Sequence, residues 1–570
     1  MSSTRSHEMP FGAAVLPQGG VRFRLWAPGA QRVDLCIAEK YFPMKAAGEG
    51  WYECVHADAA AGTLYKYRID EAQLVPDPAS RFQPQDVDGP SEVIAPSRYQ
   101  WKDAGWRSRP WTETVLYELH VGTFTPEGSY AGVAKKLKQL ADTGITAIEL
   151  LPLSDFGGKR NWGYDGVLPY APDSAYGRPE DLKALIEAAH QAGLMVFLDV
   201  VYNHFGPKGN YLGVYSPQFF TDKHKTPWGA AIDFSNPVVR QYFIHNVLYW
   251  LEEYGFDGLR FDAVHAIIDP SPRHILDEIR DSVPRAKHLV LENDANQARF
   301  IGPGKYNAQW NDDSHHGYHV LATGEEDGYY MAYADAPAKH LARCLAEGFA
   351  YQGEVSPFSH EKRGEKSSHL PPSAFVDFLQ NHDQIGNRAR GERLTQLAPA
   401  AVLMALSAIH LLAPSPPLIF MGEEWGCRQP FLFFCDFEGE LGEAVRKGRR
   451  EEFTRFKGFT GEVPDPTAEE TFKASTLDWS KADQVWLAHY KNLLGLRQKH
   501  IAARDLGPGR YRMLGERAFE VAWGSGGGAL KLIANCGDTS VKVDDVPPGD
   551  PLWSNGAPGT PWSVNWWLTA

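Results

Sequence analysis

Strand-like apolar segments alternate with helical patterns over most of the chain, and this alternation restricts the possible folds more than any other feature. Eight such strands are predicted, at residues 115–120, 145–151, 194–200, 258–261, 289–292, 308–311, 375–379 and 418–421. Helical patterns separate them, at 133–141, 179–191, 238–253, 274–281, 338–346, 400–412 and 485–496. Eight strand–helix units predict an α/β protein with a closed (β/α)8 TIM barrel, because an open doubly wound sheet rarely contains so many.

Shorter strand patterns flank the predicted barrel on both sides. Before it, segments 21–26, 33–37, 51–55 and 64–69 are separated by turn residues, which is typical of a small β-sandwich. After it, 519–523 and 529–533 flank the glycine run 524–528, which opens no helix and is therefore interpreted as a hairpin loop. We expect an N-terminal β-sandwich over residues 1–110, the barrel over 111–503 with a loop subdomain at about 204–235, and a C-terminal β-sandwich over 504–570.

Charge and composition exclude several functional classes. The 57 lysines and arginines against 71 aspartates and glutamates give a formal charge of −14. This charge gives no excess of positive residues to bind nucleic acid or an anionic membrane. The six cysteines show no spacing typical of a disulfide scaffold or a metal site. The N-terminus lacks a secretory apolar stretch, and prolines interrupt the longest apolar segment, 400–421. We expect a cytoplasmic protein with a neutral substrate and no obligate protein partner.

Acidic side chains stand at the ends of three predicted strands. Asp262, Glu292 and Asp383 end or follow the fourth, fifth and seventh strands, whose carboxyl ends meet on one face of a barrel. Arg260 shares a strand face with Asp262, where its charge would keep that carboxylate ionised, as a nucleophile requires. Glu292 ends an apolar run, where desolvation would raise its pKa and retain the proton of a general acid. This pattern is typical of a glycosidase pair.

Three histidines, His204, His265 and His382, also end or follow these strands. Each one alone fits a core residue or a helix cap. Metal binding is the alternative, but there is no HExxH motif, and histidines on separate strands have no recognisable ligand spacing. We expect them to bind sugar hydroxyls, and we predict no cofactor and no required metal.

Four segments, taken jointly and in order, resemble the signature regions of the α-amylase superfamily, glycoside hydrolase family 13. They are residues 199–204, 258–265, 291–294 and 379–383. The resemblance implies that Asp262 is the nucleophile, that Glu292 is the general acid/base, and that Asp383 stabilises the transition state. It also implies contacts with the sugar at the cleaved bond, made by Arg260, His204, His382 and the stacking platform Tyr164, with Asn203 in a structural role. The ligands of the family's calcium site are not identifiable in this sequence.

The predicted mechanism proceeds with net retention of anomeric configuration. Glu292 protonates the leaving oxygen, Asp262 attacks the anomeric carbon, and water activated by Glu292 hydrolyses the glycosyl-enzyme. Retaining enzymes of this kind hold their two carboxyl groups about 5 to 5.5 Å apart. We expect that separation between Asp262 and Glu292.

Further stretches resemble particular members of the superfamily. Segments 23–28 and 76–80 resemble the N-terminal module of its branching, debranching and trehalose-releasing enzymes. The trehalose-releasing members are matched by 226–233, 261–267, 291–294, 309–316, 380–387, 431–436 and 448–450, although the connection after Asp233 is shorter. This resemblance implies hydrolysis of the α-1,4 bond beside the terminal trehalose of maltooligosyl trehalose, with related α-glucans as further ligands.

A trehalose leaving group requires a compact polar subsite. The candidates are Trp228, Asp294, Trp310, Asn311, Asp312 and Glu423, on loops after strands, and each could equally pack a loop. A glycogen branching or debranching enzyme is the alternative function, since it would share the barrel and the acids. A non-catalytic carbohydrate-binding protein is less favoured, because such proteins typically lose one catalytic acid.

Overall fold

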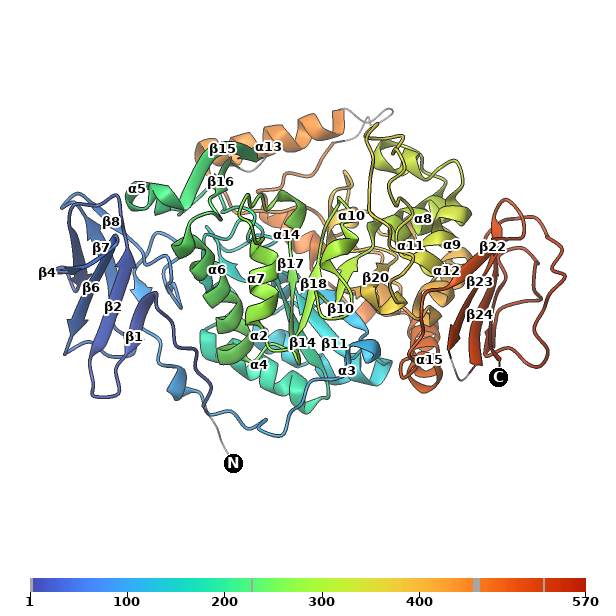
Figure 1. Ribbon diagram of the computed structural model, residues 1–570, viewed down its shortest axis with the longest axis horizontal. Helices are drawn as coiled ribbons and strands as arrows, with labels where there is room; N and C mark the ends of the chain where they lie inside the picture. The colour runs from blue at the N-terminus through green and yellow to red at the C-terminus, as the bar shows by residue number, and fades with distance from the viewer. Residues whose placement is uncertain (1–3, 227–228, 455–461, 526–527, 570) are drawn as a thin grey trace.

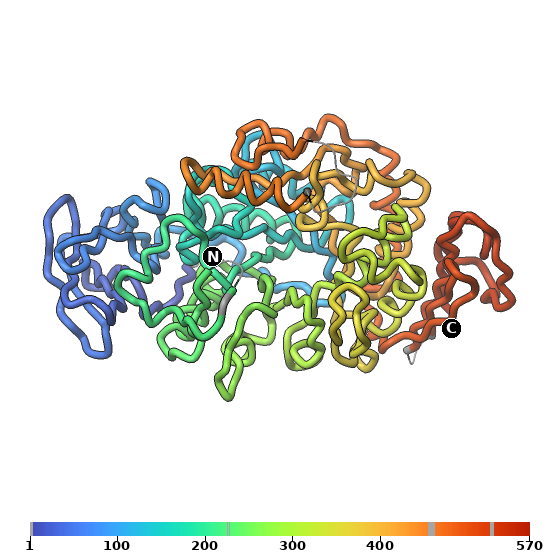
Figure 2. The backbone as a smooth tube through the Cα atoms, turned by 90° about the horizontal axis from the view of Figure 1, so that it is seen from above, coloured from blue at the N-terminus to red at the C-terminus, as the bar shows by residue number. Residues whose placement is uncertain are grey.

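The computed structural model describes residues 4–226, 229–454, 462–525 and 528–569. An N-terminal sandwich and a C-terminal sheet lie at opposite ends of the molecule, with the barrel between them in both views (Figures 1 and 2). None of the helices in these ranges is both long enough and apolar enough to cross a membrane.

The N-terminal part is a sandwich of two antiparallel sheets, as predicted. One sheet has the order β1 (Gly12–Val15), β2 (Val21–Trp26), β6 (Trp51–His56) and β5 (Lys45–Gly48). The other has the order β4 (Lys40–Pro43), β3 (Val33–Ile37), β7 (Leu64–Ile69) and β8 (Gln73–Val75), with β9 (Ser91–Glu92) also paired to β7. Phe23 of the first sheet packs edge-on against Tyr65 of the second, with ring centroids 4.8 Å apart, so apolar side chains from both sheets form one core.

Eight parallel strands form the predicted closed barrel. Their order around it is β10 (Leu116–Leu119), β11 (Ala147–Leu150), β14 (Met195–Val200), β17 (Gly258–Phe261), β18 (His288–Leu291), β19 (Ala308–Trp310), β20 (Phe375–Phe378) and β21 (Pro417–Phe420). Apolar side chains such as Leu116, Phe197 and Val290 fill the interior. Since strand side chains alternate, Glu118, two residues after Leu116, also points inward, in a layer nearer the carboxyl ends.

Most of the predicted helices are present with nearly the predicted bounds. They are α4 (Pro179–Gln191), α6 (Pro237–Tyr249), α7 (Ile275–Ser282), α9 (Pro337–Glu347), α12 (Ala400–Leu412) and α15 (Gln484–His500). The helix expected at 133–141 is instead two short helices, α2 (Tyr130–Ala134) and α3 (Leu137–Thr143), and α6 ends in a π-turn, Trp250–Tyr254. Shorter elements are α1 (Val121–Phe124), α10 (His382–Gly386), α11 (Leu394–Leu397), α14 (Glu469–Ser475), and the strand pair β12 (Ser154–Asp155) and β13 (Leu168–Pro172).

Two helices that sequence patterns did not predict lie beside the carboxyl ends of the strands. α8 (Asp312–Thr323) begins two residues after β19, and α13 (Gly439–Thr454) lies over the top of the barrel in Figure 1. The expected loop subdomain at 204–235 contains α5 (Leu212–Tyr215) and a hairpin of β15 (Phe220–Thr226) and β16 (Gly229–Ile232) on that same side.

The C-terminal part differs from the expected sandwich. Its described strands form one antiparallel sheet, in the order β22 (Arg510–Met513), β23 (Ala518–Ser525), β24 (Gly528–Asn535), β26 (Val564–Thr569) and β25 (Trp553–Ser554). A second sheet is not needed, because barrel helices cover one face. The indole nitrogens of Trp523 and Trp566 donate to carbonyls of α9 and α12, each at 3.0 Å.

The glycine run predicted to be a hairpin loop joins β23 and β24, with Ser525 paired to Gly528, while residues 526–527 lie outside the described residues. The sequence-based boundaries near 110 and 503 fall in the connections before β10 and before β22. We propose to keep them as domain limits.

Candidate active site

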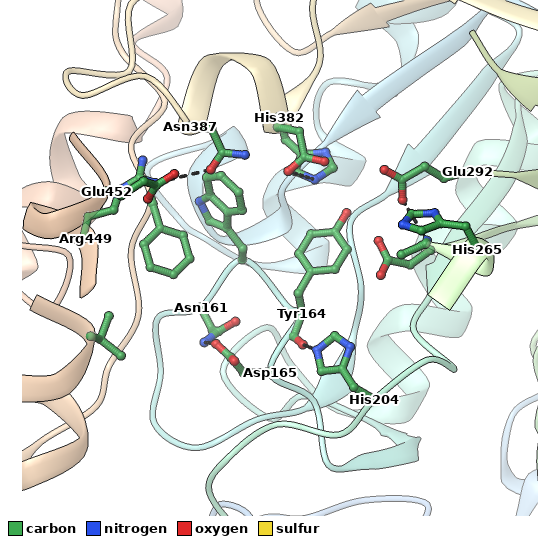
Figure 3. A pocket seen from close by; sticks show the side chains of 16 residues that line it. Asn161, Tyr164, Asp165, His204, His265, Glu292, His382, Asn387, Arg449 and Glu452 are labelled. Carbon is green, nitrogen blue, oxygen red and sulfur yellow. Dashed lines mark hydrogen bonds and ion pairs between the residues drawn. The ribbon is translucent and has the colours of Figure 1, made fainter. Parts of the chain in front are cut away.

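A cavity of about 530 Å³ opens at the carboxyl ends of the barrel strands (Figure 3). It brings together seven of the side chains predicted from sequence, namely Tyr164, His204, Asp262, His265, Glu292, His382 and Asp383. They come from separate strand ends and loops spread over more than two hundred residues of sequence. The three acids Asp262, Glu292 and Asp383 therefore line one pocket, as predicted from the sequence.

Arg260 lies beneath the acids and is fully buried. Its guanidinium nitrogens are 3.0 Å from Asp262, 2.7 Å from Glu292 and 2.5 Å from Asp199. The indole of Trp310 supports the guanidinium from below, at 4.1 Å from the ring centroid. One cation on β17 thus holds the acids of two neighbouring strands, and the sequence spacing explained only its contact with Asp262.

The expected tuning of the two carboxyl groups is wrong, because their surroundings lower the pKa of Glu292 and raise that of Asp262. Burial by itself would raise the pKa of Glu292, but Arg260 and the Ala263 amide, which donates at 2.8 Å, outweigh it and lower that pKa. Burial and then the Glu292 carboxylate raise the pKa of Asp262 well above its usual range, against the opposing effect of Arg260. The two carboxyl groups repel each other when both are ionised, and this repulsion contributes to the raised pKa of Asp262.

Asp383 is placed by the short helix α10. Asn381 caps that helix by accepting the Asp383 backbone N–H at 2.9 Å. The neighbouring His382 is almost completely buried, and its Nε2 is 3.5 Å from an Asp383 oxygen. Its Nδ1 is 2.6 Å from an oxygen of Glu118 on β10. Burial alone would lower the pKa of His382, but Asp383 and Glu118 raise it to about 9.

Tyr164 and His204 form one wall of the pocket. The Tyr164 hydroxyl donates to Asp199 at 2.6 Å, and its ring is stacked on His382 with centroids 5.0 Å apart. His204 Nε2 donates to the Tyr164 carbonyl at 3.0 Å, and burial lowers the pKa of His204 to about 4. Asn203, expected to be structural, donates to Asp262 at 3.2 Å. It therefore orients the carboxylate expected to be the nucleophile.

Further polar side chains lie beside Glu292, at one edge of the pocket (Figure 3). His265 Nδ1 accepts the Asp294 backbone N–H at 3.2 Å, and the Asp294 carboxylate pairs with Arg363 at 3.1 Å. Burial, then Glu292 and Asp294, raise the pKa of Asp312 well above its usual range. Asp312 thus lies close enough to Glu292 and Asp383 to interact with them, although neither Asp312 nor Asp294 lines the cavity.

Three predicted subsite residues have structural surroundings instead. Trp310 is 1% exposed beneath Arg260, Asn311 donates to the Gly348 carbonyl at 2.9 Å, and Glu423 accepts the Tyr490 hydroxyl at 3.0 Å. None of them lines the cavity. Asn311 and Glu423 follow strands as predicted, whereas Trp310 is the last residue of β19, and sequence does not reveal which way such side chains point. Trp228 lies outside the described residues.

The cavity also has a wall that sequence reasoning did not identify. Its further lining residues are Asn161, Trp162, Asp165, Asn387, Phe433, Val445, Arg449 and Glu452. Val445, Arg449 and Glu452 come from α13, and Figure 3 shows Arg449 and Glu452 at the opposite end from His265 and Glu292. Segments 161–165, 380–387 and 448–450 resembled family members, which was an available signal. No helix was expected at α13, so its contribution was missed.

Within the described ranges, no group of three or more His, Cys, Asp or Glu side chains is arranged to hold a metal ion. The acids instead have Arg260 and His382 as their positive partners. The expectation that no metal is required stays a prediction.

A closed barrel with three acids around one pocket at its carboxyl end defines a glycoside hydrolase of the α-amylase class. The model of the alpha amylase catalytic domain matches residues 79–216. That of carbohydrate-binding module 48, the isoamylase N-terminal domain, matches residues 10–86. Curated relatives named malto-oligosyltrehalose trehalohydrolase are more than 40% identical to the chain over most of its length, so the chain belongs to that family.

Family membership rests on similarity over most of the chain. The malto-oligosyltrehalose trehalohydrolase of Deinococcus radiodurans is 44% identical over 550 residues, which cover 94% of this chain and 91% of that relative. The one from Saccharolobus solfataricus is 42% identical over 503 residues, covering 86% and 87%. The crystal structure of a protein from Salmonella typhimurium, described as an alpha amylase, superposes on this chain with a TM-score of 0.95. The two chains are 47% identical, and the match covers 99% of this chain and 100% of that one.

Proposed function

We propose that this chain hydrolyses the α-1,4-glucosidic bond adjacent to the terminal trehalose of maltooligosyl trehalose, releasing trehalose and a maltooligosaccharide. Family membership supports the substrate, and the site supports the chemistry. The observation that carries the chemistry is the bridging of Asp262 and Glu292 by one buried guanidinium at the floor of an open pocket. Two carboxyl groups held together in this way suit acid-assisted attack on an anomeric carbon.

In the proposed first step, Glu292 gives its proton to the glycosidic oxygen while the carboxylate of Asp262 forms a bond to the anomeric carbon. The C–O bond to trehalose breaks and trehalose leaves with that proton. In the second step, Glu292 takes a proton from a water molecule, and the water oxygen attacks the anomeric carbon. The bond to Asp262 breaks with a second inversion at that carbon, so the configuration is retained overall. The first step requires a proton on Glu292, whose pKa Arg260 and the Ala263 amide lower, so the bound substrate must favour the protonated form of Glu292.

The two ends of the pocket suit the two parts of the substrate. The leaving trehalose would lie on the Glu292 side, where His265, Asp294 and Asp312 offer polar groups to a compact disaccharide. The glucan would extend toward the other end, where Trp162 and Phe433 present ring surfaces for sugar stacking. The expected carboxyl separation of about 5 to 5.5 Å between Asp262 and Glu292 stays a prediction of this mechanism.

The substrate assignment is tested by incubating the protein with maltotriosyl trehalose and, separately, with glycogen. We expect free trehalose and maltotriose from the first, with the new anomeric centre in the α configuration when observed early by NMR. New α-1,6 branches, or linear chains released from glycogen without any trehalose from the first substrate, would instead support a branching or debranching enzyme.

The nucleophile is tested with Asp262→Ala. We expect turnover of maltotriosyl trehalose to be abolished, because no glycosyl-enzyme can form, while circular dichroism and the unfolding midpoint remain close to those of the parent. Parent-like activity in this variant would remove Asp262 from the mechanism.

A further inference from the structure

The ring of His382 lies between two carboxylates. Nδ1 is 2.6 Å from Glu118 Oε1, and Nε2 is 3.5 Å from Asp383 Oδ1. A carboxylate only accepts hydrogen bonds, and only the imidazolium form of histidine can donate from both ring nitrogens. Glu118 also accepts the His382 backbone N–H at 3.1 Å, so it fixes both the position and the orientation of the ring.

Aromatic rings around His382 also favour its charged form. Tyr164 is stacked on it at 5.0 Å with an interplanar angle of 17°, and Trp162 approaches at 5.5 Å and 88°. Trp310 lies at 6.2 Å. Electron-rich ring faces stabilise a neighbouring cation, particularly away from water, and the side chains of His382 and Glu118 are each 1% exposed.

Other charged and titratable groups face His382 from the surrounding elements. They are Asp383 on α10, Glu118 on β10, Glu149 on β11, Asp199 on β14, Arg260 on β17, Glu292 after β18, and His120 after β10. Arg260 and His120 disfavour a second positive charge, while the acids favour it. Among these groups, only Glu118 accepts a hydrogen bond from Nδ1 of the ring, so it controls the proton at that nitrogen.

We propose that Glu118 is a positioning residue that keeps His382 as an imidazolium, and that through this cation it keeps Asp383 ionised next to the sugar. The inference rests on the proposed function for the role of Asp383 and goes beyond it by assigning a task to a buried strand residue that does not line the pocket. Burial and the Glu292 charge both disfavour an ionised Asp383, whereas His382 favours it.

The variant Glu118→Gln tests the charge of His382 without changing the position of its ring. A glutamine can still accept the His382 backbone N–H, but its amide nitrogen then faces Nδ1 as a donor, which favours a neutral ring that accepts there. The ring keeps its place, and its Nε2–H still points at Asp383. At neutral pH the ion pair of Glu118 with His382 is thereby replaced by a neutral hydrogen-bonded pair.

Glu149→Gln is the matched control. Glu149 pairs in register with Glu118 on the neighbouring strand and is equally buried, yet neither of its oxygens has a hydrogen-bond partner among the described residues. Burial, then Asp199 and Glu118, raise its pKa well above the usual range, which favours its uncharged form. The glutamine has the same shape as that form.

The protonation of His382 is read directly by NMR of protein labelled with 13C at histidine Cε1, with the His382 signal assigned by its loss in His382→Gln. We expect His382 to remain charged through pH 8 in the parent and in Glu149→Gln. In Glu118→Gln we expect its titration midpoint to fall by at least about one pH unit. This measurement does not depend on the substrate, so it can fail while the proposed function stands.

The pH profile of kcat/KM provides the functional measurement. In Glu118→Gln its alkaline limb should move to lower pH, while Glu149→Gln keeps the parent profile. A purely structural role of Glu118 would lower the rate equally at every pH. The proposal is overturned if His382 titrates at the same pH in Glu118→Gln as in the parent, if it is neutral at pH 7 in the parent, or if the alkaline limb does not move.

Discussion

At the scale of single residues, Arg260 decides how charge is distributed in the pocket. It contacts Asp199, Asp262 and Glu292 at once, and with no exposed surface its charge is poorly screened by water. Its positive charge favours the ionised forms of all three acids, against burial and against their mutual repulsion. Sequence spacing predicted the contact with Asp262, but the contact with Glu292 depends on β17 and β18 being neighbours in the barrel.

Glu292→Gln tests the role of the proton donor. An amide cannot protonate the leaving oxygen, so kcat on maltotriosyl trehalose should fall by about 10² to 10⁴-fold. A substrate with an activated leaving group, such as α-maltosyl fluoride, needs no proton in the first step, and its rate of glycosylation should fall far less. Equal losses on both substrates would contradict the assignment of Glu292 as general acid.

At the scale of secondary structure elements, α13 connects the pocket wall to the helix that carries Asp383. Arg449 of α13 donates to the Gly386 carbonyl at the end of α10 and, at 3.3 Å, to the Asn387 side chain. The side chain is 9% exposed, and its guanidinium faces the ring of Phe433 at 5.3 Å from the centroid. Because the same residue lines the cavity, α13 contributes to binding and to the placement of α10.

Arg449→Ala is predicted to weaken substrate binding. Hydrogen bonds from a charged group contribute about 1.5 to 3 kcal/mol each, so KM for maltotriosyl trehalose should rise at least about tenfold. Lys447→Ala on the same helix is the control, since the Lys447 side chain is 77% exposed and its ion pair among the described residues is with Glu451, at 3.8 Å. If both variants keep the parent KM in steady-state assays, α13 has no part in binding.

At the scale of the whole molecule, a buried charge cluster joins the N-terminal segments to the amino end of the barrel. His190, the penultimate residue of α4, lies 2.6 Å from Asp103 in the connection before the barrel and 3.0 Å from Asp257 before β17. Arg5 near the N-terminus also pairs with Asp103, at 2.8 Å. The histidine is 1% exposed and lies between two buried carboxylates, of which Asp103 has Arg5 as a second cationic partner.

His190→Gln should therefore destabilise the fold by about 3 to 5 kcal/mol, because it removes the cation that the buried Asp257 and Asp103 share, although Asp103 keeps Arg5. Burial alone would lower the pKa of His190, but Asp103 and Asp257 outweigh it and raise that pKa. A raised pKa in the folded state gives stability that is complete below the unfolded value of about 6.5 and is lost as pH rises through the folded value.

Urea unfolding at pH 6 and pH 9 checks this prediction. The difference in unfolding free energy between parent and His190→Gln should be larger at pH 6 than at pH 9. The specific activity of the folded variant should match that of the parent, since the cluster lies at the amino end of the strands, away from the pocket. A difference that grows toward pH 9 would contradict the charged state assigned to His190.

Much of the fold was predictable because each element carries its own local pattern. The eight strands and helices such as α4 and α12 were found within a few residues, since apolar periodicity is a property of neighbouring residues. α13 was missed because its segment is polar, with charged residues such as Glu443, Arg446 and Lys447 over much of its surface. The C-terminal sheet was expected to need a second sheet because sequence does not reveal that barrel helices cover it.

By itself the sequence determined which residues are acids, on which strand ends they stand, and to which family the motifs are similar. The tertiary structure alone decided which side chains reach the pocket, so that Arg449 lines it while Trp310, Asn311 and Glu423 do not. The tertiary structure also determined which ionisable side chains influence each other, through the contacts of Arg260 with Asp262 and Glu292 and of Glu118 with His382. The physical reason is that direction, burial and the distance between charges arise only when strands far apart in the chain become neighbours.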